Sequence, residues 1–213
     1  MDFLANIVQQ VLTVLYNFTE SVGIPNLGLA IVLMTIIIKL IMYPLTQKQI
    51  QSTKAMMEIQ PKMKALQEKY KDDKQRLNME LANLYKSEGV NPLAGCLPLL
   101  IQMPIMIGIF YGIRDYNYAA HPEIVTSFLW LADISQKDPT KVLPVLSALT
   151  TFIQTKQTMP AAGGAQNKMM MYFMPLFIGY ISFDFPAGLV LYWVVMNIMQ
   201  IAQQSIMNRA AAK

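Results

Sequence analysis

A lysine lies inside one of the long apolar stretches of this chain, and it limits what the chain can fold into. Residues 27–42 are apolar apart from Thr35 and Lys39. A helix over 27–46 would be long enough to cross a bilayer, which takes about 20 residues. A cation at that depth costs at least about 2.5 kcal/mol on insertion scales, unless water or a partner stabilises it. The alternative is a side chain that extends to the headgroups. We interpret Lys39 as the candidate functional centre.

The composition is typical of a membrane protein. Of the 213 residues, 54% are hydrophobic and only 14% are charged, whereas soluble domains contain about 25% charged residues. The one cysteine, Cys96, cannot form a disulfide within the chain. The net charge of +4 is small and scattered, so no specific recognition of nucleic acid is expected. The sequence therefore predicts an all-α polytopic membrane protein.

Two segments outside the expected spans have helical patterns of their own. Apolar residues at helical spacing between 3 and 20 predict an amphipathic helix lying in the membrane interface, within an extracytoplasmic segment 1–26. Residues 47–91 carry two short heptad patterns on either side of a charged turn, which predict a cytoplasmic antiparallel helical hairpin. Pro61 would either kink the first helix of this hairpin or begin its second half.

Five transmembrane helices are expected, at 27–46, 92–113, 142–158, 169–183 and 187–206. An extracytoplasmic loop at 114–141, a cytoplasmic loop at 159–168 and a cytoplasmic tail at 207–213 would connect or follow them. In the second span, Gly108 and Gly112 form a GxxxG pair, which allows close approach of another helix.

The distribution of basic residues predicts the orientation. With the hairpin in the cytoplasm, all of the 17 lysine and arginine residues except Lys39, Arg114, Lys137 and Lys141 lie on the cytoplasmic side. Loops rich in lysine and arginine stay in the cytoplasm. We therefore expect the N-terminus outside, the C-terminus inside, and a location in the bacterial plasma (inner) membrane.

Polar side chains within the expected spans form the candidate site around Lys39. Thr35 and Tyr43 lie one helical turn before and after the lysine, so one helix would place all three on one face. The other spans add Gln102, Ser147, Thr150, Thr151, Gln154, Tyr192, Trp193, Asn197 and Gln200. No expected span contains an acidic residue. Lys39 would therefore be hydrated in a cavity lined by these groups, or else buried and uncharged. Ordinary hydrogen bonding between helices is the simpler explanation for part of this set.

Two other classes of protein also place polar or charged groups within membrane spans. An intramembrane protease needs a nucleophile with a base, or two carboxylates, within the spans. The single histidine, His121, lies in the outer loop and Asp184 lies at a span end, so we expect no enzyme, no catalytic residue, no metal and no cofactor. A small anion transporter or channel using Lys39 is the alternative, although the chain shows no internal repeat typical of transporters.

Several longer motifs resemble one known family. The segments Thr35–Thr46, Pro61–Lys62, Tyr85–Pro104, Trp130–Ile134 and Phe185–Trp193 are similar, in this order, to the conserved core of the YidC/Oxa1/Alb3 membrane protein insertases. The similarity covers essentially the whole chain. It is closest to the short form, Gram-positive-like, which has no large extracytoplasmic domain. The groove cation of that family is usually arginine, and Lys39 occupies its place, so the charge is kept without the rigid fork of a guanidinium.

The resemblance implies a function and a set of partners. It implies a hydrophilic groove open to the cytoplasm and the lipid, through which small membrane proteins are inserted and helped to fold as by a chaperone. Its partners would be nascent membrane proteins and the lipid bilayer, with the ribosome and the Sec translocon as further candidates. No nucleotide hydrolysis is expected, since the sequence contains no G-x-x-x-x-G-K-[ST] phosphate loop.

Overall fold

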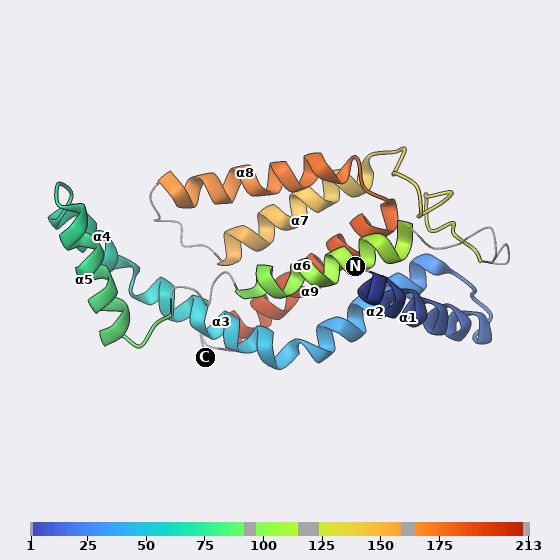
Figure 1. Cartoon of the computed structure of the whole chain (residues 1–213), viewed down its shortest axis with the longest axis horizontal. Helices are drawn as coiled ribbons and strands as arrows, with labels where there is room; N and C mark the ends of the chain where they lie inside the picture. The colour runs from blue at the N-terminus through green and yellow to red at the C-terminus, as the bar shows by residue number, and fades with distance from the viewer. Residues whose placement is uncertain (1, 92–96, 115–123, 159–164, 211–213) are drawn as a thin grey trace.

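The computed structural model describes residues 2–91, 97–114, 124–158 and 165–210. Within these ranges all of the secondary-structure elements are helices (Figure 1). The prediction of an all-α fold is therefore confirmed for this part of the chain. The helices are α1 (Asp2–Ser21), α2 (Leu27–Ile41), α3 (Tyr43–Glu58), α4 (Gln60–Lys69), α5 (Lys74–Ser87), α6 (Leu97–Arg114), α7 (Val142–Thr158), α8 (Ala165–Ser182) and α9 (Ala187–Ala210).

Length and hydropathy identify fewer candidate spans than the five expected. Within the described residues, Ala187–Arg209 of α9 meets both criteria alone, and α2 and α3 meet them together although they are bent by 63°. Leu100–Arg114 and Met169–Ser182 are apolar but shorter. The polar side chains of α7 keep its hydropathy low. The number of spans remains a prediction.

The bend between α2 and α3 has a local cause. Helix α2 ends at Ile41, where the N–H of Met42 still bonds to the carbonyl of Ile38 at 2.9 Å. Pro44 then occupies the first turn of α3. Proline has no N–H to continue the earlier helix and its ring clashes with the carbonyl four residues before it. The expected first span 27–46 is therefore not one straight helix. Pro61 similarly lies in the first turn of α4, so it begins a helix and does not kink one.

Helix α9 is the centre of the bundle. It packs against α7, α2 and α6, while α8 packs on the outer side of α7 and α1 packs against α6 and α2 (Figure 1). The GxxxG pair of α6 faces α1: a Cβ atom at Gly112 would lie 2.7 Å from a methyl carbon of Val8. The amphipathic helix therefore docks onto α6 through small residues, and its exposed side keeps large apolar residues such as Phe3, Val14 and Phe18.

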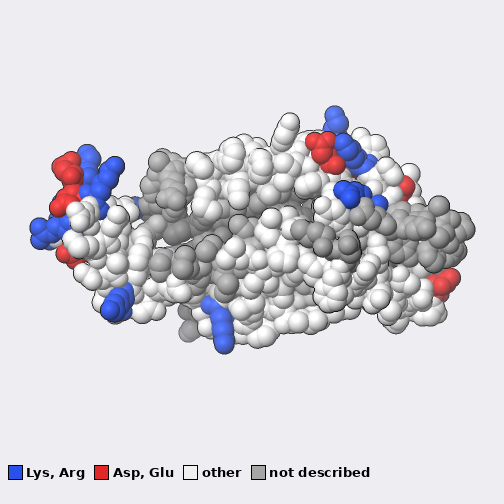
Figure 2. Space-filling model, in the orientation of Figure 1, with Lys and Arg blue, Asp and Glu red and all other residues white. Residues whose placement is uncertain are grey.

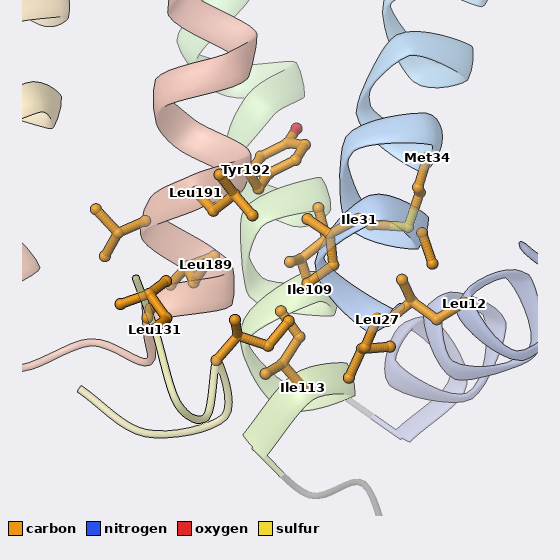
Figure 3. Close-up of a cluster of buried hydrophobic side chains, with 14 of the residues drawn as sticks. Leu12, Leu27, Ile31, Met34, Ile109, Ile113, Leu131, Leu189, Leu191 and Tyr192 are labelled. Atoms are coloured by element: carbon orange, nitrogen blue, oxygen red, sulfur yellow. The ribbon is translucent and has the colours of Figure 1, made fainter. Parts of the chain in front are cut away.

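The apolar core lies at one end of the bundle, where α1, α2, α6 and α9 meet (Figure 3). A loop crosses this end and bonds to the first turns of two helices. The carbonyl of Val125 accepts from Leu27 N at 3.0 Å, and that of Ile134 accepts from Gly188 N at 2.8 Å. The core side chains shown in Figure 3 include Leu12, Leu27, Ile31, Met34, Ile109, Ile113, Leu131, Leu189, Leu191 and Tyr192. This end is closed by packed side chains.

Charged side chains gather at the two ends of the molecule. In the face shown in Figure 2, acidic and basic groups cluster over the α4–α5 end and at the opposite end, with one basic side chain near the lower edge between them. The described residues of the stretch between show no other charge on this face, as a surface in contact with lipid requires. Helices α4 and α5 lie side by side (Figure 1), contain no buried residue, and are joined across the exposed pair Lys62–Glu88 at 2.6 Å.

Candidate functional site

Lys39 lies in the last turn of α2 and is buried, with only 6% of its surface exposed. Its Nζ donates a hydrogen bond to Oε1 of Gln200 on α9. Among the described residues, its partner is thus an amide oxygen and not a carboxylate. The bend after Ile41 places the lysine at the C-terminal end of a helix, where the helix dipole favours a cation. A single straight helix over 27–46 would not place the lysine at a helix end.

A cavity of about 280 Å³ opens beside Lys39. Helices α2, α3, α6, α7, α8 and α9 all contribute to its lining. Along α9 it extends from Trp193 to Gln204, which is about 16 Å at 1.5 Å per residue. Among the described residues that line it, Lys39 is the only charged one. We call this cavity the groove.

Seven of the residues proposed from the sequence line the groove, and the structure brings them together from four helices. They are Lys39, Gln102, Thr151, Gln154, Trp193, Asn197 and Gln200. A hydrogen-bond network fixes one wall, since Nδ2 of Asn197 donates to the hydroxyls of Thr150 at 3.1 Å and Thr151 at 2.9 Å. The indole N–H of Trp193 donates to Thr151 at 3.0 Å. These bonds join α9 to α7 and hold the wall rigid.

The other proposed residues lie outside the lining. Thr35 and Ser147 are fully buried and donate to the backbone carbonyls of Ile31 and Pro144 of their own helices. Thr150 does the same toward Leu146. Tyr192 is buried in the closed core, where its hydroxyl accepts from Nε2 of Gln102 at 2.6 Å.

Tyr43 is 46% exposed and is absent from the groove lining. The expectation that it shares a face with Thr35 and Lys39 assumed a continuous helix, and the bend at Met42 removes that continuity.

The structure adds groove residues that the sequence reasoning did not propose. On α3 these are Thr46, Gln49 and Thr53, on α7 they are Thr155 and Thr158, and on α9 the addition is Gln204. Helix spacing could have found them, because Gln204 lies two turns after Asn197, and the three α3 residues recur at intervals of three and four. Apolar lining residues were missed as well: Met42, Ile50, Met170, Met174, Ile178 and Met196. The groove lining therefore combines uncharged polar side chains with methionine and isoleucine side chains.

The fold and groove of the described part of the chain define a class of protein: a helical bundle with exposed apolar faces and a buried lysine beside a cavity of mixed polar and apolar lining. The family described as 60Kd inner membrane protein matches residues 17–213, and the chain belongs to this family.

Relatives named membrane protein insertase YidC are similar to most of this chain. The one from Maridesulfovibrio salexigens is 41% identical over 189 residues, which cover 86% of this chain and 35% of that protein. The one from Citrifermentans bemidjiense is 40% identical over 198 residues, covering 93% of this chain and 35% of that protein. The one from Syntrophus aciditrophicus is 41% identical over 197 residues, covering 92% of this chain and 35% of that protein. The chain therefore spans about a third of the length of these relatives.

Proposed function

We propose that this protein inserts small membrane proteins into the bilayer through the groove, and that it helps them fold there. The observation that carries the proposal is the buried Lys39 beside a cavity that many uncharged polar side chains line. Among the described residues, this lysine is paired with an amide and with no carboxylate. Family membership supports it, since the similar proteins from three bacteria are named membrane protein insertases.

The groove addresses the main obstacle in insertion, which is the passage of polar residues through hydrocarbon. Each unpaired polar group in lipid costs several kcal/mol. The hydrocarbon core is about 30 Å thick, and the groove follows about 16 Å of α9. A polar segment that lies in the groove would therefore have to pass through only about half of the thickness of the hydrocarbon core.

Lys39 acts in this mechanism as a point charge. It attracts acidic residues in the translocated tail of the client, and hydration or amide contacts keep the ammonium stable before the client arrives. The apolar segment of the client then moves along the lipid-facing edges of α2 and α9, which expose Leu40, Ile41 and Ile198. Hydrophobic transfer and the membrane potential supply the free energy, and no nucleotide takes part.

The distribution of basic residues sets the orientation in the membrane, and the orientation indicates further partners. The N-terminus lies outside and the C-terminus in the cytoplasm, so the groove mouth near α3 faces the cytoplasm. The exposed α4–α5 hairpin receives clients there, or contacts ribosomes or the Sec translocon. Deletion of 60–86 tests this role: loss of insertion with retained groove structure supports it, and normal insertion contradicts it.

Reconstitution tests the function as a whole. The purified chain in liposomes should protect the tail of a single-span client from external protease, and empty liposomes should not. Photo-crosslinkers at Thr46 and Gln154 should capture that client.

The alternative is a small anion channel that uses the same buried cation. Chloride flux in client-free liposomes that disappears in Lys39→Met would favour the channel. Client protection without flux would favour insertion.

A further inference from the structure

The part of the groove beyond Lys39 is lined by uncharged polar side chains on three helices. We call this part the amide vestibule and define it by Thr46, Gln49 and Thr53 on α3, Gln154 on α7, and Gln200 and Gln204 on α9. On α3 and on α9 the members are spaced by three or four residues, so on each of these two helices they share one face. The vestibule contains both hydrogen-bond donors and acceptors, but no charge.

The threonines of the vestibule offer only acceptors to a ligand. The hydroxyl of Thr46 donates to the backbone carbonyl of Met42 at 2.9 Å, and that of Thr53 donates to the backbone carbonyl of Gln49 at 2.9 Å. On α7, Thr155 and Thr158 also line the groove, and their hydroxyls donate to the backbone carbonyls of Thr151 at 2.8 Å and Gln154 at 3.0 Å. A hydroxyl has one proton, and each of these is used within its own helix. Uncharged donors for a ligand must therefore come from the glutamine amides.

Two of these amides have an atom without a partner among the described residues. Nε2 of Gln49 and Oε1 of Gln204 are buried and make no hydrogen bond. The two residues are only 7% and 1% exposed. By contrast, Oε1 of Gln200 accepts from Lys39. Since a buried polar group without a partner is unfavourable, an unpaired donor on α3 and an unpaired acceptor on α9, on two residues that line one cavity, indicate a missing ligand.

The ligand must be neutral and must carry both a donor and an acceptor. The peptide group fits this description, and every residue of a client supplies one whatever its side chain. A helical client cannot use it, because the main-chain groups of a helix bond to each other. We infer that the amide vestibule binds the main chain of the client's polar segment in an extended conformation, with Gln49 donating to a carbonyl and Gln204 accepting from an N–H.

The dimensions suit a short extended segment. From Thr46 to Thr53 the stripe on α3 is about 10 Å long at 1.5 Å per residue. An extended chain advances about 3.3 Å per residue, so about three client residues fit along it. The inference rests on the proposed function and assigns separate roles to two parts of the groove. Lys39 attracts acidic side chains of the client tail, whereas the vestibule binds the main chain of any sequence.

A client without acidic residues separates these two roles. The full chain is reconstituted in phosphatidylethanolamine–phosphatidylglycerol liposomes with a single-span client whose tail contains only glycine and serine. Gln49→Leu and Gln204→Leu should each slow insertion of this client about three- to tenfold, the effect of losing one hydrogen bond.

Gln203→Leu is the matched control. Gln203 is adjacent on α9, equally buried and also without partners on both amide atoms, but it does not line the groove. Its leucine variant should insert the client at the wild-type rate.

A second measurement changes the main chain of the client. Esters replacing three consecutive amides in the client tail remove the N–H groups and leave the side chains unchanged. Insertion by the wild type and by Gln203→Leu should slow about three- to tenfold, whereas Gln204→Leu should show no further loss.

The outcomes are distinct for the two proposals. If the wild type does not insert the neutral client above the level of empty liposomes, the proposed function fails. If the wild type inserts it, but Gln49→Leu and Gln204→Leu match Gln203→Leu and the ester client inserts normally, the vestibule holds water only and this inference is wrong.

Discussion

Replacing Lys39 by methionine removes the only charge that lines the groove within the described residues while keeping a long unbranched side chain. The buried amine now donates to Oε1 of Gln200. After the change this oxygen still faces the cavity, where water can bond to it, so the fold should persist. Lys39→Arg is the matched control, since it keeps the charge.

The size of the effect follows from the interaction of an ammonium with a client carboxylate. At 4 Å this attraction is about 1 kcal/mol in bulk water and about 4 kcal/mol at an effective dielectric constant of 20. A wet groove lies between these limits. Loss of the charge should therefore slow insertion of an acidic-tailed client at least fivefold, since 1.4 kcal/mol corresponds to about a factor of ten.

The assay is protease protection of two single-span clients in liposomes, one with an acidic tail and one with a glycine–serine tail. Lys39→Met should slow only the acidic client, and Lys39→Arg should stay within about twofold of the wild type for both. Added salt should reduce the advantage of the wild type for the acidic client. Equal rates for methionine, arginine and lysine with the acidic client would refute the role of the charge.

Three further changes test the framework that positions the groove, each by thermal unfolding in detergent. Gly112→Ala should lower the free energy of unfolding by about 1–3 kcal/mol, because its Cβ would lie 2.7 Å from Val8, whereas Gly108→Ala, one turn earlier with a nearest contact of 3.3 Å, should cost less than about 1 kcal/mol. Asn197→Leu should cost about 1–3 kcal/mol, since it removes both hydrogen bonds to α7. Asp138→Ala should cost about 0.5–2 kcal/mol, because the carboxylate accepts from the N–H of Leu143 at 2.7 Å in the first turn of α7.

The Asp138 prediction includes a pH dependence. Burial raises the pKa of Asp138, but hydrogen bonds from Thr140 and Leu143 outweigh it and hold the pKa below its usual value. A carboxyl with a lowered folded pKa stabilises the fold above its unfolded pKa of about 3.9. This stabilisation is lost as the pH falls through the folded value. The difference between wild type and Asp138→Ala should therefore be full at neutral pH and decrease in acid; a constant difference would contradict the assignment.

Equal unfolding of Gly112→Ala and Gly108→Ala would show that α1 does not depend on close approach to α6. An Asn197→Leu variant as stable as the wild type would show that the bonds to Thr150 and Thr151 are not what joins α7 to α9.

The sequence was sufficient for the class of fold and for the candidate centre. Apolar stretches at helical length predict helices because backbone groups in lipid must pair within the segment. The lysine at position 39 stood out because a cation among apolar residues is costly wherever the chain places it. The motifs around it also indicated the family, which the comparison over residues 17–213 confirms.

The composition of the site depended on the tertiary structure. The bend of 63° after Ile41 turns Tyr43 away from the groove and brings Gln49 into it, and both effects depend on how α3 leaves α2. Whether a buried threonine or serine faces a cavity or a neighbouring helix is not encoded in its own helix. Ser147 and Thr150 carry the same polarity as Thr151, yet only Thr151 lines the groove.

The residue types and their spacing thus determined which helices form and which side chains are polar within them. Packing around α9 decided which of those polar groups share one cavity, because that depends on the rotation and crossing of helices far apart in the chain. The cation is therefore visible in the sequence, whereas its amide partner Gln200, 161 residues away, is a product of the fold.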